Sequence, residues 1–327
     1  SRLERGMERR LVGLGQQMRG LSQRLGGFFY TGYSEESLGL FRVYFGCLVF
    51  LYHIPQFATL FAIDPFGASF HYTDPIWYFE LLGIDRTIPW LSLLAGLLLF
   101  ASTLSMTLGK WTRTSIIVVL ICIFYLKGVR DSAAGDVHHR YVVLVQILFF
   151  LLLSRCGEAA TGRIPGKSGG LLEWEASWPI RAAQVYVAFF YLFALVAKIR
   201  VSGWDWFFDG GGRLQEQLIV RSVRWGLSDE GEPLRNALSF HLAGIQWLVF
   251  LMCLFVTALE LLFPLILFVK RNLIKLCFVA CAFLFHVANY VLLDVNFLLY
   301  GLVLLVFFDL AQIRGWLRER LGSRVPG

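Results

Sequence analysis

The sequence predicts an all-α protein, a polytopic membrane bundle of about eight transmembrane helices plus an N-terminal amphipathic helix at the membrane surface. Two observations predict this fold class. Of the 327 residues, 57% are hydrophobic and 16% are charged, and the mean hydropathy of +0.62 exceeds that of ordinary soluble domains. The apolar residues also gather in runs that approach or exceed the thickness of a bilayer. We therefore expect the lipid bilayer to be the main partner of this chain.

Residues 1–33 predict the amphipathic helix. Six arginines alternate there with leucine and methionine at steps of three and four residues, which places the apolar side chains on one helical face. Ser34 and the two glutamates after it predict the start of the first span. We expect three parts: this segment on the cytoplasmic surface, a transmembrane domain over 34–312, and a basic cytoplasmic tail over 313–327.

The apolar runs give the expected spans, and the residues between them give the breaks. Pro264 is expected to kink the sixth span, and residues 294–296 to hinge the last two. We expect loops over 127–140 and 155–181, and an interfacial helix over 213–225. The expected spans are 38–61, 88–108, 114–126, 141–153, 180–198, 237–269 and two spans within 276–310.

The distribution of basic residues predicts the orientation in the membrane. Lysine and arginine exceed aspartate and glutamate by 30 to 23, and the positive-inside rule assigns the basic segments to the cytoplasm. Both tails and the turns at Lys110 and Lys270 belong to that side. The segments 127–140 and 199–236 fall on the outer side although they are also basic, so we expect a functional site that opens outward.

The composition also excludes some functions. The basic surplus is spread between the spans and does not form one patch, so we expect no nucleic-acid partner. The cysteines lie in or at the ends of apolar runs and lack the spacing of a metal finger or of a redox pair. We therefore expect buried free thiols and no metal centre built on them. The six cysteines are Cys47, Cys122, Cys156, Cys253, Cys277 and Cys281.

Lys198 is the leading candidate for a functional side chain. It stands at the end of an apolar run and before a turn rich in tryptophan and glycine, which includes Trp204. Hydrocarbon disfavours a charged ammonium group, so this lysine is a candidate base. The alternative is an anchoring lysine whose stem lies in lipid while its amino group reaches the interface.

Three further polar side chains gather between the third and fourth spans. Asp136, His138 and His139 offer one carboxylate and two imidazoles within four residues, which suits a proton relay or part of a metal site. The alternative is a hydrogen-bonded loop without chemistry. A metal-dependent oxidation would require further ligands, and no such ligand pattern follows in the sequence.

Two ionisable residues lie within neighbouring predicted spans. Glu260 and His286 each require a partner in lipid, and the simplest expectation is that they contact one another. Arg42 and Gln184 are expected to belong to the same internal polar core. The 30 phenylalanines fit lipid contact and packing, or a pocket for a flat hydrophobic cofactor such as a quinone.

Several of these residues together resemble a known family, the HTTM domain. This domain is the membrane part of vitamin K-dependent gamma-glutamyl carboxylases, and it also occurs in many bacterial proteins. The resemblance covers residues 34–312 and depends on order and spacing, with no single motif sufficient. It is carried by Phe41-Arg42 with Phe45-Gly46, His139-Arg140-Tyr141, Gln184, Tyr191 and Lys198 at seven-residue steps, Trp204, Gly210, Glu260 to Pro264, and Phe285-His286.

The resemblance implies a membrane enzyme of the bacterial inner membrane that oxygenates a reduced quinone. In the family, a lysine acts as base on reduced vitamin K, a naphthoquinol, and O2 then gives an epoxide. The strong base so produced removes a proton from a glutamate side chain before CO2 adds. Lys198 corresponds to that lysine, and His139 to the histidine that stabilises the carboxylation step.

Two positions depart from the animal carboxylases. His138 stands where they carry asparagine, and Ala197 where they carry a second lysine. Carboxylation of a glutamate-containing secreted peptide is therefore left open, whereas quinol oxygenation is the main expectation. The alternative is a non-enzymatic membrane factor for maturation of, or immunity to, a secreted peptide, in which Lys198 and residues 213–235 bind an acidic ligand.

Overall fold

A computed structural model shows a helical membrane protein. It describes residues 20, 23, 26–60, 64, 66–72, 74–134, 142–159, 170–224, 226–228, 233, 234 and 236–322. Within these ranges the chain forms helices and loops, and no strand longer than an isolated bridge. Six helices of this described part are long and apolar enough to cross a membrane. The predicted all-α class and the membrane environment are thus confirmed.

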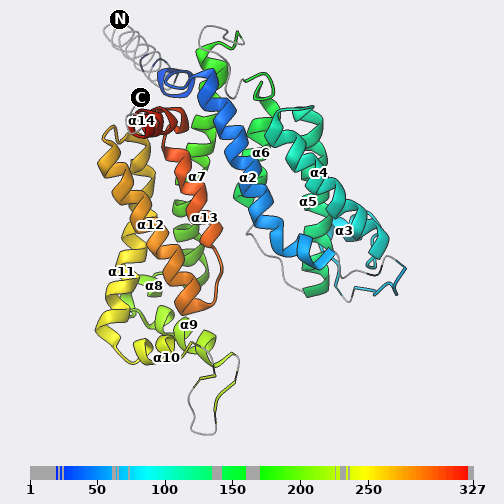
Figure 1. Ribbon diagram of the computed structural model, residues 1–327. Coiled ribbons are helices and arrows are strands. Elements are labelled where there is room, and N and C mark those ends of the chain that lie inside the picture. The colour runs from blue at the N-terminus through cyan, green and yellow to red at the C-terminus, as the bar shows by residue number, and fades with distance from the viewer. Residues whose placement is uncertain are drawn as a thin grey trace, which may run out of the picture.

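The first group of helices forms one side of the bundle (Figure 1). α2 (Glu35–Leu60) packs on α4 (Pro89–Leu108), and α4 packs on α5 (Thr112–Ala134). The approach of α2 to α4 depends on Gly46, because a Cβ atom there would lie 2.0 Å from the Thr107 hydroxyl oxygen. A short helix, α3 (Trp77–Leu81), lies in the loop between α2 and α4.

The second group contains the candidate site. Its helices are α6 (Val142–Leu153), α7 (Glu173–Ser202), α8 (Asp205–Phe208), α9 (Gly212–Val223), α10 (Ala237–Ala243), α11 (Gln246–Leu262), η2 (Phe263–Phe268), α12 (Asn272–Leu293), α13 (Leu298–Val303), η3 (Leu304–Phe307) and α14 (Leu310–Gly322). α7 packs on α11 and on the 3₁₀ helix η2, and α12 leads into α13. α9 and α10 cover the lower end of this group in Figure 1.

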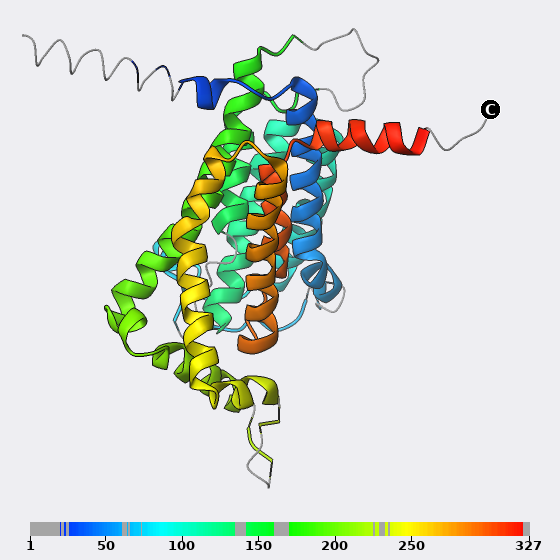
Figure 2. The same cartoon turned by 90° about the vertical axis from the view of Figure 1, so that its left-hand side faces the viewer.

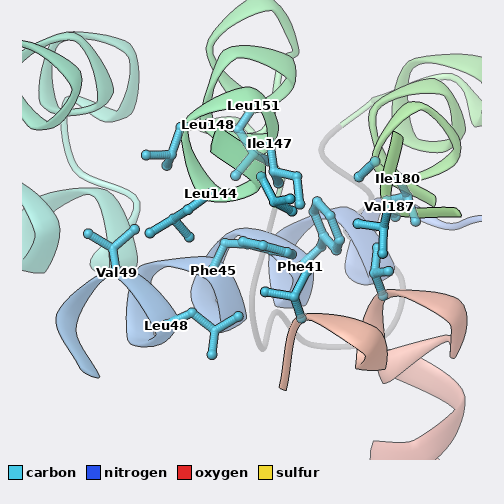
Figure 3. Close-up of a cluster of buried hydrophobic side chains, with 14 of the residues drawn as sticks. Phe41, Phe45, Leu48, Val49, Leu144, Ile147, Leu148, Leu151, Ile180 and Val187 are labelled. Carbon is cyan, nitrogen blue, oxygen red and sulfur yellow. The ribbon is translucent and has the colours of Figure 1, made fainter. Parts of the chain in front are cut away.

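The two groups meet in a continuous apolar core. Figure 3 shows this core where α2, α6 and α7 come together. Phe41 and Phe45, one helical turn apart on α2, lie with their ring centroids 4.6 Å apart. Ile147 and Leu148 of α6 are fully buried against this cluster. α6 therefore crosses the interior although it has only 12 residues.

The two ends of the bundle differ. Residues 26–34, which precede α2, lie at one end together with α14, whereas α9 and α10 lie at the other end (Figure 2). α14 is bent by 88° from the segment 298–307 that precedes it, so it lies across the end of the bundle. Of the predicted helix over 1–33, the first 19 residues lie outside the described residues.

Several expected boundaries are wrong. α5 continues through Ala134, beyond the predicted end at Leu126, because Lys127 and Asp131 pair at i, i+4 and extend the helix. α7 begins at Glu173, before Pro179, because the Glu175 carboxylate accepts a hydrogen bond from the Leu172 N–H at 2.9 Å and caps the helix. The predicted flexible loop over 155–181 is therefore helical in its last part.

The later spans agree in part. The predicted sixth span consists of α10, α11 and η2, and the change from α to 3₁₀ helix occurs at Phe263 and Pro264, where a kink was expected. Asp294 ends α12 with φ 53°, which confirms the expected break at 294–296. The predicted interfacial segment is the helix α9. The described residues do not contain eight helices long enough to span a membrane, because α6 and the segment 298–307 are short.

The cysteines are free thiols, but not all of them are buried. Cys122, Cys156 and Cys253 are buried, whereas Cys47 and Cys277 are exposed on the outside of the bundle. The expectation of buried thiols is wrong for these two positions. Apolar sequence alone does not separate a side chain that packs inside a membrane bundle from one that faces lipid.

Candidate functional site

The centre of the candidate site is an ion pair between Lys198 and Glu260. Lys198 lies in the last two turns of α7, and Glu260 lies in the last turn of α11. The Lys198 ammonium donates a hydrogen bond to Oε1 of Glu260. The Glu260 side chain is 1% exposed and that of Lys198 is 27% exposed. Since a carboxylate inside an apolar bundle is costly without a cation, this pair explains how Glu260 is accommodated.

A tryptophan forms part of the surroundings of the amino group. Gly203, with φ 65°, ends α7 and turns the chain into α8, which places the Trp206 ring 5.7 Å from the Lys198 Nζ atom. The indole N–H of Trp206 donates to the Thr257 hydroxyl at 3.1 Å and so fixes the ring. The lysine cation therefore contacts both a carboxylate and an aromatic face.

This tryptophan is not the one that the sequence predicted. Trp204 was the expected site residue, but its side chain is 67% exposed and it does not line the cavity beside Lys198. The short helix α8 separates the directions of the two rings, because residues two positions apart lie on different faces of a helical turn. Recognition of a helical turn directly after Gly203 would have favoured Trp206.

A cavity of about 490 Å³ opens beside the ion pair, and its walls come from α6, α7, α8, α9, α11, α12, α13 and η3. This volume is within the usual range for pockets that bind small molecules. Most lining side chains are apolar or aromatic. They include Val143, Val187, Phe190, Ala194, Phe285, Phe297, Val303 and Leu304, and the polar members include Lys198, Glu260, Tyr191, His286, Asn289 and Gln217.

A histidine and a tyrosine form a second polar pair in the cavity wall. The His286 Nε2 atom and the Tyr191 hydroxyl lie 2.8 Å apart. The Tyr191 ring stacks on Phe263 with a centroid distance of 4.1 Å and an interplanar angle of 28°, which holds the hydroxyl in place. The expected contact between Glu260 and His286 is not formed, because each has a different partner on α7: Lys198 for Glu260 and Tyr191 for His286.

Two buried atoms of these pairs have no hydrogen-bond partner within the described part of the chain. They are Oε2 of Glu260 and Nδ1 of His286. A buried polar atom without a partner is unfavourable by about 1–3 kcal/mol, and a bound polar group is one explanation for such an atom. Both residues line the same cavity, so a polar ligand group there would find hydrogen-bonding capacity on two sides.

Arg42 and Gln184 lie elsewhere. Arg42 is buried on α2, and its Nη1 atom donates to the carbonyl oxygens of Cys156, at 2.5 Å, and Ala159, at 3.3 Å. Gln184 donates to the Tyr33 hydroxyl at 2.7 Å and to the Val306 carbonyl at 2.8 Å. Gln184 precedes Lys198 by 14 residues on one helix, or about 21 Å. Both side chains join helices near the α14 end, so the expectation that they share the polar core of Glu260 and His286 is wrong.

Asp136, His138 and His139 lie outside the described residues, between α5 and α6. Their roles in catalysis, in a proton relay or in metal binding remain hypotheses from the sequence. Across the described ranges, no group of three or more histidine, cysteine, aspartate or glutamate side chains has the arrangement of a metal site.

The site therefore consists of Lys198, Glu260, Tyr191 and His286 around an apolar cavity, with Trp206 as an addition that the sequence did not indicate. Sequence comparison adds nothing to this set. The chain matches no family model, no characterised protein and no solved structure in the comparisons made with it.

Proposed function

We propose that this protein is an HTTM-type membrane enzyme that oxygenates a reduced quinone, with Lys198 as the base. The observation that carries the proposal is the Lys198–Glu260 pair in the wall of a predominantly apolar cavity. Such a cavity suits a flat hydrophobic ring, and the pair supplies proton transfer at one point of its wall.

The lining residues fit a naphthoquinol. Phe190, Phe285 and Phe297 offer aromatic and apolar contact to a ring system, while Glu260 and His286 each have a hydrogen-bonding atom without a partner among the described residues. A quinol has two hydroxyl groups on opposite sides of its ring. When bound, reduced vitamin K would supply, with O2, an oxidation in which one oxygen atom enters the ring as an epoxide and the other leaves as water.

The role of Glu260 is to hold the proton that Lys198 must release. A base requires a neutral amine, and the Lys198 ammonium already donates to Oε1 of Glu260. Proton transfer along this hydrogen bond gives an amine and a carboxylic acid, so the pair can supply the neutral base that the reaction requires. The Lys198 amine then accepts the proton of a quinol hydroxyl.

His286 and Tyr191 orient the opposite side of the ligand. If the Tyr191 hydroxyl donates to Nε2 of His286, the ring proton resides on Nδ1, which then acts as a donor. In this arrangement His286 binds an oxygen atom of the ligand while Lys198 removes a proton from another. We retain His139 as the second catalytic group on the basis of the resemblance, with Asp136 and His138 as its neighbours.

We also propose an orientation in the bacterial inner membrane. The basic turns at Lys110 and Lys270 lie at the same end as α14 (Figure 1), which supports a cytoplasmic location of that end and of both termini. The cavity lies in the half of the bundle nearer to α9, so it would open toward the outer face. The proposed count of eight spans includes α6 and the segment 298–307.

The proposal is tested with the purified full chain, reduced vitamin K and O2. We expect epoxide from the wild-type protein and loss of epoxide from Lys198→Ala. Lys127→Ala is the matched control, because Lys127 also pairs with a buried carboxylate but does not line this cavity. Labelled CO2 and a glutamate-containing peptide, added in a separate reaction, test the carboxylation step.

Two results would contradict the proposal. Equal epoxide formation by the wild-type protein and by Lys198→Ala would remove the lysine from the reaction. No epoxide at all from a folded wild-type protein would exclude quinol oxygenation and favour the non-enzymatic alternative, a membrane factor that acts on a secreted peptide.

A further inference from the structure

A second cleft, of about 720 Å³, lies at the other end of the bundle. It is formed by the first part of α7, the turn between η2 and α12, and α14. Arg181 in its wall precedes Lys198 by 17 residues on the same helix, a distance of about 25 Å. The cleft is therefore separate from the proposed quinol cavity, and its role is independent of that proposal.

Three cations line this cleft: Arg181, Lys270 and Lys275. None of them forms an ion pair with a carboxylate of the described chain. Among the described residues of the lining, Asp309 is the one acidic side chain. Its Oδ1 atom accepts hydrogen bonds from the Ser37 hydroxyl and the Ala311 N–H, both at 2.9 Å, and so caps α14. The cleft therefore carries uncompensated positive charge.

Arg181 is held in a fixed position for binding. Its guanidinium lies 4.9 Å from the centroids of both the Phe28 and Tyr33 rings, and its Nη1 atom donates to Oε1 of Gln184 at 3.1 Å. Its Nε atom is buried and has no partner in the described part of the structure. An arginine that is oriented by its neighbours and retains free donors is suited to an oxyanion such as phosphate.

The other side of the cleft carries apolar side chains beside Asp309 and Gln312. Phe307, Phe308 and Trp316 line it, and Trp316 belongs to α14, which lies across the end of the membrane helices (Figure 2). Tryptophan on a helix in this position is typical of the boundary between lipid tails and head groups. The cleft thus places positive charge beside an apolar surface at the level of the bilayer interface.

We propose that this cleft binds the phosphate head group of an anionic membrane lipid. Arg181, Lys270 and Lys275 contact the phosphate, and Phe308 and Trp316 contact the first carbons of the lipid chains. A site for a free phosphate ion does not require these apolar side chains, whereas a lipid with hydrocarbon chains does. Basic pockets between transmembrane helices are a known form of lipid recognition.

Native mass spectrometry of the full chain in mild detergent tests the proposal. We expect phosphatidylglycerol to remain bound to the wild-type protein and phosphatidylcholine to be lost. The variant Lys270→Gln with Lys275→Gln removes two of the three cations and should weaken phosphatidylglycerol binding roughly thirtyfold. Lys270 is exposed and Lys275 half-buried, so the variant should fold, which size-exclusion chromatography checks.

The control removes equal charge from the same end of the bundle. Lys110→Gln with Arg113→Gln changes two exposed cations outside the cleft, and it should leave phosphatidylglycerol binding within about twofold of wild type. An equal loss in the control would show general surface attraction and overturn the proposal. Displacement of phosphatidylglycerol by excess inorganic phosphate would also overturn it and identify a free-phosphate site.

Discussion

The described part of the protein contains two pairs of a lysine and a buried carboxylate, and their surroundings differ. Lys127 and Asp131 are four residues apart on α5. Lys198 and Glu260 are 62 residues apart and join α7 to α11. In both pairs the carboxylate side chain is 1% exposed, but Lys127 is 13% exposed and Lys198 is 27% exposed.

The difference shows how the same chemistry serves two purposes. The pair on α5 extends a helix, and the neighbouring Ser132 hydroxyl accepts a hydrogen bond from the Ile76 N–H at 3.0 Å, which fixes the loop before α3. The pair between α7 and α11 faces a cavity. An intramembrane charge pair is therefore a better candidate for function when it joins separate helices beside a cavity than when it closes one helical turn.

The largest expected effect comes from breaking the pair between helices. Lys198→Met leaves Glu260 buried without its cation, and we expect the free energy of unfolding to fall by about 3–5 kcal/mol. The double variant Lys198→Met with Glu260→Leu removes both charges and should recover most of this loss. Thermal unfolding in detergent measures both. If the single variant is as stable as wild type, the pair does not form in the folded protein.

The next comparison replaces each carboxylate by its amide. Glu260→Gln keeps the shape of the side chain but cannot accept the lysine proton, and we expect epoxide formation to fall about 100-fold. Asp131→Asn makes the equivalent change on α5 and should leave activity within about twofold. Rates of epoxide formation with reduced vitamin K measure both. Similar losses in the two variants would indicate a general effect of charge removal on the bundle.

The third prediction concerns the histidine and tyrosine. Tyr191→Phe keeps the ring stacked on Phe263 but leaves Nε2 of His286 without its partner, so we expect a loss of about 1–2 kcal/mol in stability. His286→Phe with Tyr191→Phe removes both polar groups and should be less destabilising than the single change. Thermal unfolding of the two variants decides this. A single variant as stable as wild type would mean that the hydrogen bond contributes little.

Much of the fold could be predicted from the sequence. Long apolar runs predicted the helices, and residues 294–296 predicted a break that the structure contains. At Pro264, where a kink was predicted, the helix changes from α to 3₁₀. The predicted first and last residues of the helices were less reliable. Lys127 and Asp131 look like loop residues in a list of polar positions, yet their spacing of four lets them pair within a helix and extend it.

The site could be predicted only in part. Lys198, Glu260 and His286 stand out because ionisable residues are rare inside apolar runs. Their partners depend on how the helices pack, which the sequence does not specify, so Glu260 was paired with the wrong residue. Arg42 stands out for the same reason but binds the carbonyl oxygens of Cys156 and Ala159. An intramembrane charge therefore indicates a need for a partner, and only the packing shows whether a cavity lies beside it.

The smallest expected effect separates the two tryptophans after α7. Trp206→Phe keeps an aromatic ring near the Lys198 cation but loses the hydrogen bond to Thr257, so we expect a loss of about 0.5–1 kcal/mol. Trp204→Phe changes an exposed side chain and should stay within about 0.5 kcal/mol of wild type. Because Trp206 also lines the cavity, its replacement should in addition raise the KM for reduced vitamin K, whereas Trp204→Phe should not. A KM that rises only in Trp204→Phe would support Trp204, the site residue predicted from the sequence, and would place the ligand outside this cavity.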